Sequence, residues 1–262
     1  MYVKNIKELE ELTVERLFPM TVAEFDSLSM DLIRRFGLAA WRRLFNKRML
    51  EFYLPEAKKK ACAVTVKEAK FIREKVQEII ERKKLEGHIK RDPLKLGSRW
   101  TTGKLGEYAF AKQLGYNYVD LEAFNLSSKG DIPDVLGLAG IKTSKLGNFP
   151  LVSRRRSEYP QIIFVEDKNR TYYNTGIYHV EDLNAYTEDK LVKDRNALYS
   201  KTAFYNYSRG LPFGSGLTNF YDAVSNVTHR SFEEVKAIGD AEIQKLEAKK
   251  SEQKDMPAWW NW

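Results

Sequence analysis

The sequence predicts an α/β protein, with a mixed central sheet flanked by helices and a helical lobe in front of it. Three observations support this prediction. Helical spacing and capping patterns dominate the first part of the chain, a buried β-type run (QIIFV) stands at residues 161–165, and the character of the chain changes after Asp92-Pro93. We therefore expect a basic helical lobe over residues 1–92 and an α/β core over residues 93–262.

The composition is that of a chain with a packed core. Of its 262 residues, 43% are hydrophobic and 13% are aromatic, which is enough apolar surface to bury. No stretch approaches the roughly 18 apolar residues of a membrane helix, and the opening MYVKNIKELEELTV lacks the apolar run of a signal peptide. We expect a cytoplasmic chain that does not enter a membrane. The single cysteine, Cys62, excludes a disulfide framework and a Cys-based zinc site.

Capping boxes mark where several helices begin. In such a box a Ser or Thr hydroxyl accepts a hydrogen bond from a free backbone amide, and a Glu three residues later reaches back. The box Thr65–Glu68 opens a stretch with apolar residues at helical intervals to about Leu85. The box Ser231–Glu234 opens a polar helix to about Lys250. Two more helices are expected, over residues 100–114 and 183–207.

Short strands are expected in the second part of the chain. Residues 161–165 form a continuous apolar and β-branched run, which is typical of a strand buried on both faces. Weaker β-type segments cover residues 117–121 and 134–141. The segment GLPFGSG at residues 210–216 is interpreted as a loop, because it lacks the Lys-Ser/Thr ending of a phosphate loop.

The net charge of +8 is unevenly distributed. Residues 34–60 contain nine basic side chains against two acidic ones, and residues 142–156 contain five basic side chains and no acidic one. Concentrated cationic charge beside aromatic residues is typical of phosphate binding, although each cluster alone is also compatible with a solvated surface. We therefore expect a nucleic acid, rather than an anionic lipid or a protein, as the partner. The residues expected to contact it are Arg42, Arg43, Lys47, Arg48, Lys142, Lys145, Arg154, Arg155, Arg156 and Arg170.

One arrangement points to chemistry: an acidic residue that opens a strand, and Glu-x-Lys that closes the next buried strand. Asp134 follows Pro133, and Glu166-Asp167-Lys168 follows QIIFV directly. Because side chains alternate along a strand, Glu166 and Lys168 would share a face. If the two strands pair, the carboxylates of Asp134 and Glu166 and the backbone carbonyl of Asp167 would suit Mg²⁺. Lys168 would then orient or deprotonate the attacking water.

Alternatives remain open for these residues. Glu-x-Lys occurs eight times in the chain, and only the copy at Glu166 ends a predicted buried strand. A purely structural salt bridge between Lys168 and Asp134 is the alternative without function. Asp131 lies three residues before Asp134, and either could be the metal ligand; we favour Asp134. Tyrosines after the Glu-x-Lys strand, such as Tyr172, are candidates to line a DNA groove.

Residues 98–170 resemble the core of the PD-(D/E)XK nucleases, which has a helix, a strand hairpin opening with Pro-Asp, and then Glu-x-Lys. The helical sequence Gly103-Lys-Leu-Gly-Glu107 is similar to a glycine-glutamate signature that many members carry before the hairpin. The resemblance implies Asp134 and Glu166 as ligands of one or two Mg²⁺ ions. It also implies Lys168 as the catalytic lysine and Glu107 as an auxiliary catalytic acid.

The activity that the resemblance implies is a magnesium-dependent endonuclease on double-stranded DNA, most like a type II restriction or phage enzyme. Cleavage of both strands needs two active sites, so we expect a homodimer. The tail at residues 257–262, with three tryptophans, is expected to dock on the core or on a partner subunit. A non-catalytic nucleic-acid-binding protein, a structure-specific phage or repair nuclease, and a phage interaction protein remain the alternatives.

Overall fold

The fold is seen in a computed structural model of the chain. It describes residues 61–85, 93–116, 119–121, 133–145, 152–153, 159–167, 170–181, 202–203 and 210–252, together with isolated positions before residue 45. The predicted lobe over residues 1–92 lies mostly outside these residues, so the expected boundary at residue 92 stays a prediction. The tryptophan-rich tail also lies outside them.

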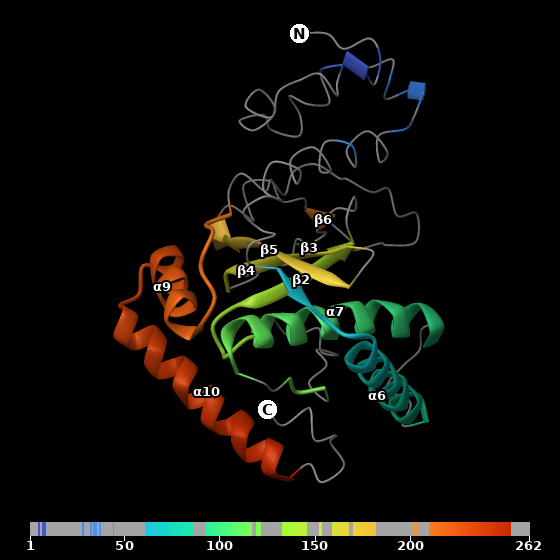
Figure 1. The fold of residues 1–262 in the computed structure, drawn as a ribbon. Coiled ribbons are helices and arrows are strands. Elements are labelled where there is room, and N and C mark those ends of the chain that lie inside the picture. The colour runs from blue at the N-terminus through green and yellow to red at the C-terminus, as the bar shows by residue number, and fades with distance from the viewer. Residues whose placement is uncertain are drawn as a thin grey trace.

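A four-stranded sheet forms the centre of the molecule (Figure 1). Its order is β1 (Cys62–Ala63), β5 (Thr171–Tyr178), β4 (Gln161–Glu166) and β2 (Gly140–Lys145). β2 runs parallel to β4, whereas the β4–β5 and β5–β1 pairs are antiparallel, so the sheet is mixed. A separate pair of short strands joins β3 (Val152–Ser153) to β6 (Thr202–Ala203).

Helices flank this sheet, as the sequence predicts. α7 (Pro93–Leu114) lies along one face, and α6 (Val66–Leu85) packs beside α7 (Figure 1). α9 (Leu217–Thr228) and α10 (Phe232–Glu252) form a second helical pair, which lies on the side of the sheet away from α6 (Figure 1). The predicted class, a mixed α/β sheet with flanking helices, is confirmed. No described helix is long and apolar enough to cross a bilayer.

Local signals explain where the helices begin and end. In the box Thr65–Glu68 the Thr65 amide donates to Glu68 Oε2 at 2.6 Å, and the Glu68 amide donates to Thr65 Oγ1 at 3.2 Å. α7 ends at Gly115, which has φ +80° and donates its amide to the Ala111 carbonyl at 3.0 Å. The Glu234 amide donates to Ser231 Oγ at 3.3 Å at the start of α10.

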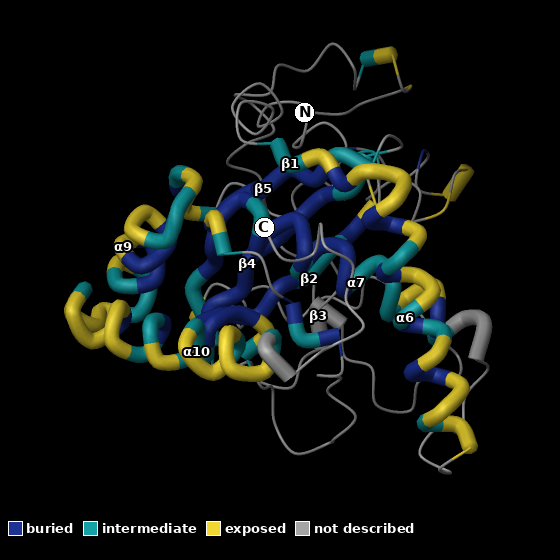
Figure 2. Tube along the Cα trace, turned by 60° about the horizontal axis from the view of Figure 1, so that its bottom comes forward, coloured by how far each residue is buried: buried dark blue, intermediate teal, exposed yellow. Residues whose placement is uncertain are grey.

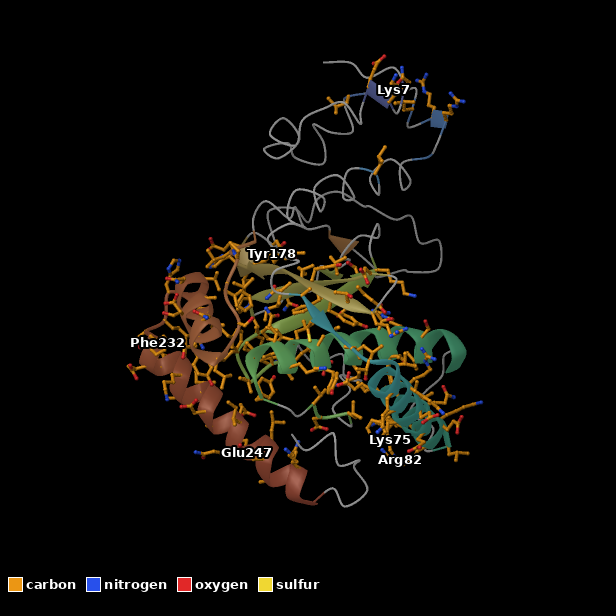
Figure 3. The ribbon with its side chains drawn as sticks, in the orientation of Figure 1. Lys7, Lys75, Arg82, Tyr178, Phe232 and Glu247 are labelled. Carbon is orange, nitrogen blue, oxygen red and sulfur yellow. The ribbon has the colours of Figure 1, made fainter. Side chains whose placement is uncertain are left out.

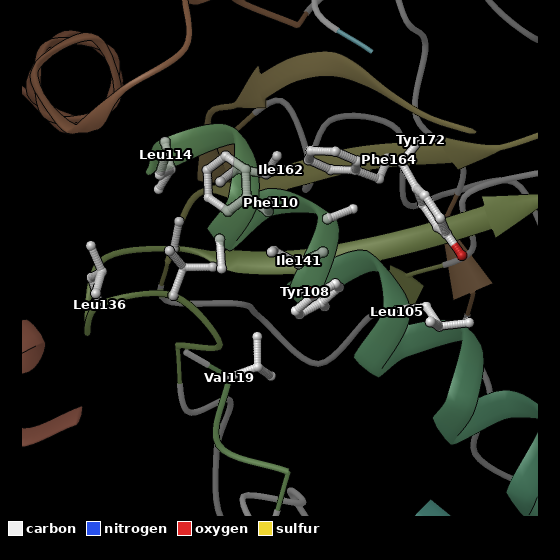
Figure 4. Packing of buried hydrophobic residues seen from close by; sticks show 14 of the residues in the cluster. Leu105, Tyr108, Phe110, Leu114, Val119, Leu136, Ile141, Ile162, Phe164 and Tyr172 are labelled. Atoms are coloured by element: carbon white, nitrogen blue, oxygen red, sulfur yellow. The ribbon is translucent and has the colours of Figure 1, made fainter. Parts of the chain in front are cut away.

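The core lies between α7 and the sheet (Figure 4). Phe110 of α7 packs edge-on against Phe164 of β4, with ring centroids 5.5 Å apart, and against Phe220 of α9 at 5.4 Å. Figure 2 shows the strands and the inner face of α7 as buried, while α6, α9 and α10 expose their outer faces. Each buried Phe contributes about 1.5–3 kcal/mol to this core.

The sheet corrects the weaker strand predictions. Residues 134–141 do not form one strand: a turn reverses the chain, with positive φ at Leu136 (48°) and Gly137 (68°), and the strand runs over residues 140–145. The described residues 119–121 belong to no strand.

Other predictions are corrected at their ends. Residues 202–203, expected within a helix over residues 183–207, pair as β6 with β3. The other residues of that predicted helix lie outside the described residues. α7 begins at Pro93, earlier than expected, because proline fits the first helical turn.

Candidate active site at the edge of the sheet

Asp134 lies at the start of β2, where a tight turn returns the chain. Val135 and Ala139 pair across this turn, with the Val135 amide donating to the Ala139 carbonyl at 2.9 Å. The positive φ of Leu136 and Gly137 gives the turn the twist that hairpins favour. The Ile141 amide then donates to Asp134 Oδ2 at 2.8 Å. Asp134 is therefore fixed beside the first residues of the strand.

Glu107 reaches the same edge from α7 because the helix packs unusually close to β2. A methyl group on Gly106 would lie 1.8 Å from Thr143 Oγ1, so no larger residue fits there without movement. Glu107 follows directly, and Lys104 Nζ donates to Glu107 Oε2 at 2.7 Å and to the Asp120 carbonyl at 3.0 Å. The glycine-glutamate pair predicted on this helix thus brings a carboxylate to the sheet.

The charges at this edge influence one another. Burial raises the pKa of Glu107 to about 7; the Lys104 ammonium opposes the rise, and the Asp134 carboxylate adds to it. Lys142 Nζ lies 4.0 Å from Asp134 Oδ2 and also favours the charged form of Glu107. We call Lys104, Glu107, Asp134 and Lys142 the edge cluster. Glu107 keeps 16% of its side-chain surface exposed, so solvent reaches it.

The structure does not bring Asp134 and Glu166 together. The register of the parallel pair sets Ile141 opposite Ile162 and Lys145 opposite Glu166. Asp134 is bonded to the Ile141 amide, four strand positions from the level of Glu166, or about 13 Å at 3.3 Å per residue. This distance separates backbone levels along β2, whereas one Mg²⁺ needs its ligand atoms at about 2.1 Å.

The parallel direction of the strands explains this result. An acid that opens one strand meets a Glu that closes the next only when the strands run antiparallel. β2 and β4 run parallel, so the two carboxylates lie toward opposite ends of the pair. The register therefore gives no support to a metal set of Asp134, Glu166 and the Asp167 carbonyl, and that set stays a prediction.

The hairpin after Glu166 also differs from the expected continuous strand. β4 ends at Glu166, and the Arg170 amide donates to the Asp167 carbonyl at 3.3 Å to reverse the chain. The Asp167 carboxylate accepts hydrogen bonds from the Thr171 amide at 3.1 Å and the Tyr173 hydroxyl at 2.9 Å. Strand alternation therefore stops at Glu166. Lys168 lies outside the described residues.

The remaining predicted site residues divide into two groups. Lys142 belongs to the edge cluster, Lys145 is exposed at the end of β2, and Arg170 lies in the β4–β5 hairpin. The other predicted DNA contacts and the alternative ligand lie outside the described residues; they are Arg42, Arg43, Lys47, Arg48, Arg154, Arg155, Arg156 and Asp131.

Sequence reasoning missed the role of one residue, Lys104, and the burial of another, Tyr172. Lys104 precedes Glu107 by three residues, a spacing that predicts a helical ion pair but is too common to single one out. Tyr172, a candidate to line a groove, is fully buried in β5, at 0% exposure, beside Glu166. Nothing in the tyrosine-rich sequence distinguishes a buried tyrosine from an exposed one.

Oxygen atoms at the edge cluster are compatible with a hard cation. In the part of the chain that the structure describes, Glu107 Oε1 and Asp134 Oδ1 receive no hydrogen bond, since the bonds at these carboxylates reach Oε2 and Oδ2. Two such carboxylates with several waters suit Mg²⁺. No group of three or more His, Cys, Asp or Glu among the described residues is arranged to hold a metal.

Comparison with protein families, curated proteins and solved structures found no match for this chain. The resemblance of residues 98–170 to the PD-(D/E)XK nucleases therefore stays an expectation. A function for the chain is inferred from the arrangement of its own residues, chiefly Glu107, Asp134 and Lys142.

Proposed function

We propose that the chain is a magnesium-dependent endonuclease that acts on double-stranded DNA as a homodimer. The observation that carries the proposal is the convergence of two carboxylates, Glu107 and Asp134, with Lys142 at 4.0 Å from Asp134. Two carboxylates can hold a divalent ion, and a lysine can face the charge of a phosphate, so this set of groups is suited to metal-assisted phosphodiester hydrolysis. The proposal moves the chemistry from Glu166 to the edge cluster.

Each residue of the edge cluster has a distinct role in this proposal. Asp134, fixed by the Ile141 amide, and Glu107 would hold Mg²⁺ through their oxygens without hydrogen bonds. Bound Mg²⁺ would offset the charge of the phosphate and acidify a bound water. Lys142 faces the negative charge that develops on the phosphate. The Lys104 ammonium opposes the rise in the pKa of Glu107 that burial causes, and so favours the charged carboxylate that would bind the ion.

Digestion of supercoiled plasmid tests this function. We expect nicked and linear products with Mg²⁺ and none with EDTA. Glu107→Gln should remove the activity, whereas Glu78→Gln, an exposed acid of α6, should leave it unchanged. Intact plasmid from a folded, DNA-binding wild-type protein would overturn the proposal. Discrete fragments would indicate sequence specificity, and cutting confined to branched DNA would indicate the structure-specific alternative.

A nucleic-acid-binding protein that does not cut is the second candidate. The separation of Asp134 from Glu166 by about 13 Å along the strands favours it, because the expected motif then holds no single ion. A pure binder should retain DNA equally well with Mg²⁺ and with EDTA in a gel-shift assay. It should also lose affinity steeply as salt rises.

A further inference from the structure

An ion pair joins α10 to the rest of the molecule near the C-terminal end of the helix. The apolar side chains of Ile243 and Leu246 pack against the core. Lys249 follows Leu246 by three residues, so it continues the same face of the helix. Lys249 Nζ lies 2.7 Å from Asp120 Oδ2. The last described helix is thus tied to the short segment at residues 119–121.

Asp120 also contacts the edge cluster, through its backbone. The Asp120 carbonyl accepts a hydrogen bond from Lys104 Nζ at 3.0 Å. The same ammonium donates to Glu107 Oε2 at 2.7 Å. A continuous series of contacts therefore runs from Lys249 of α10, through Asp120 and Lys104, to the Glu107 carboxylate.

The position of the Asp120 carbonyl matters because the Lys104 ammonium is almost fully buried. Only 6% of the side-chain surface of Lys104 is exposed. A buried ammonium is costly unless its N–H groups are hydrogen-bonded, and the Asp120 carbonyl and the Glu107 carboxylate are two of its partners. A shift of this carbonyl would therefore move the ammonium, and with it the carboxylate that the ammonium holds.

α10 also contacts the turn that positions Asp134. The helix runs beneath α7 in the view of Figure 1. A methyl group added to Gly137, in this turn, would lie 3.2 Å from Glu242 Cγ and 3.6 Å from Ile238 Cγ2, and both side chains belong to α10. Because Lys249 of the same helix holds the segment at residues 119–121, α10 supports both acids of the edge cluster.

We propose that Lys249 and Asp120 are positioning residues of the candidate active site. Their ion pair holds the Asp120 carbonyl against Lys104 and thereby fixes Glu107 for the ion, as groups behind a ligand commonly do. The inference rests on the proposed function and extends it to a helix that no sequence motif links to the site. Because 57% of the Lys249 side chain is exposed, the effect of the pair is expected to be small.

A role confined to stability is the alternative. Val119 and Leu121, on either side of Asp120, are buried in the core and could hold the segment without the ion pair. The pair would then only fasten the end of α10, and its loss would leave Glu107 in place. The two possibilities differ in the surroundings of the Glu107 carboxylate, which can be measured directly.

Carbon-13 NMR of the full chain, labelled at its glutamate carboxyl groups, tests this difference in the absence of Mg²⁺ at one fixed pH. The Glu107 resonance is assigned by its absence from Glu107→Gln. Lys249→Met removes the ammonium and keeps a strong helix former, so we expect the resonance to move. In Lys249→Arg, which keeps the charge, it should return to the wild-type position. An unmoved resonance in Lys249→Met would overturn the inference.

A lysine of the same helix provides the matched control. Lys245 pairs with Glu242 within α10 itself, so Lys245→Met removes an equal charge without breaking a link to another element. Glu247, labelled in Figure 3, lies between Lys245 and Lys249 on this part of α10. The Glu107 resonance should stay in place in Lys245→Met. An equal movement in the two Met variants would mean a general charge effect and would also overturn the inference.

Calorimetric titration of Mg²⁺ gives the functional readout. Lys249→Met should bind Mg²⁺ about two- to fivefold more weakly than wild type, which is the size expected from an exposed ion pair. Lys249→Arg and Lys245→Met should bind it as wild type does. Equal affinity in wild type and Lys249→Met, with a lower stability of Lys249→Met in urea, would assign the pair to stability alone and overturn the inference.

Plasmid cleavage by wild type with Mg²⁺ is measured separately, so that the two proposals can fail independently. Cleavage by wild type, with an unmoved Glu107 resonance in Lys249→Met, would leave the proposed function standing and remove the inference. A resonance that moves as expected, in a chain that neither binds Mg²⁺ nor cleaves DNA, would keep the link from Lys249 to Glu107 and remove the proposed function.

Discussion

The edge cluster and the corner formed by Glu166, Arg170 and Tyr172 lie toward the two ends of the same pair of parallel strands, β2 and β4. At the edge, Lys104 pairs with Glu107, and Asp134 accepts the Ile141 amide, so its charged groups are mutually compensated. At the corner, the buried Tyr172 hydroxyl and Arg170 Nε have no hydrogen-bond partner of good geometry among the described residues, and the nearby Glu166 carboxylate raises the pKa of Tyr172. The edge therefore holds compensated charges that are accessible to solvent, whereas the corner holds buried polar atoms that cost free energy.

The largest expected difference between the two regions is in cleavage rate. Asp134→Asn removes a carboxylate of the edge cluster and should lower the cleavage rate by about a thousandfold, since loss of a positioned acid–base or ligand group costs about that order. Glu166→Gln should lower it less than tenfold on a fixed plasmid at saturating protein. Single-turnover rates check this prediction, and equal losses in the two variants would contradict the division of roles.

The next largest effect is the change with pH in the free energy of unfolding that the titration of Glu107 causes. The pKa of Glu107 is raised from 4.5 to about 7 in the folded protein. The folded state therefore binds this proton more tightly than the unfolded state, so the stabilisation is present below pH 4.5 and is lost as pH rises through 7. The loss is roughly 3 kcal/mol at most.

Urea denaturation at pH 4.5 and pH 8, for wild type and Glu107→Gln, measures this effect. The variant cannot titrate, so its stability should fall less over that interval than that of wild type. A fall of the same size in both proteins would show that Glu107 does not titrate in this range.

A smaller effect is expected from the partner of Glu107. Lys104→Met removes the ammonium that lowers the pKa of Glu107, so this pKa should rise. The acid limb of the pH profile of kcat/KM should therefore move to higher pH. Lys104→Arg keeps the charge and should keep the limb in place. An unmoved limb in Lys104→Met would contradict the coupling.

The smallest effect is expected at the corner. Tyr172→Phe removes a buried hydroxyl that has no hydrogen bond, so it should stabilise the folded protein by about 1 kcal/mol. Thermal unfolding without DNA checks this change. A loss of stability would mean that the hydroxyl forms a hydrogen bond in the folded protein, and this would contradict its assignment as an unpaired buried group.

The sequence predicts the parts of this fold that depend on local rules. The box Thr65–Glu68 and the end of α7 at Gly115 follow from hydrogen bonds within a few residues. The buried strand at residues 161–166 follows from its apolar run. The glycine-glutamate pattern identifies Glu107 because it reflects the close contact of Gly106 with Thr143.

The rest depends on long-range pairing, which no local pattern encodes. Whether β2 runs parallel or antiparallel to β4 decides whether Asp134 meets Glu166, and both directions are compatible with the same residues. The strand at residues 171–178 has no apolar alternation, because Asn174, Thr175 and Gly176 interrupt it. Its burial comes from neighbours that the sequence alone does not identify.

Calorimetric titration of Mg²⁺ into wild type, Asp134→Asn and Glu166→Gln tests most directly where the ion binds. We expect wild type and Glu166→Gln to bind Mg²⁺ with similar affinity, and Asp134→Asn to lose the binding heat. Binding that survives in Asp134→Asn and disappears in Glu166→Gln would contradict the assignment of the metal to the edge cluster. It would return the chemistry to the strand that ends at Glu166.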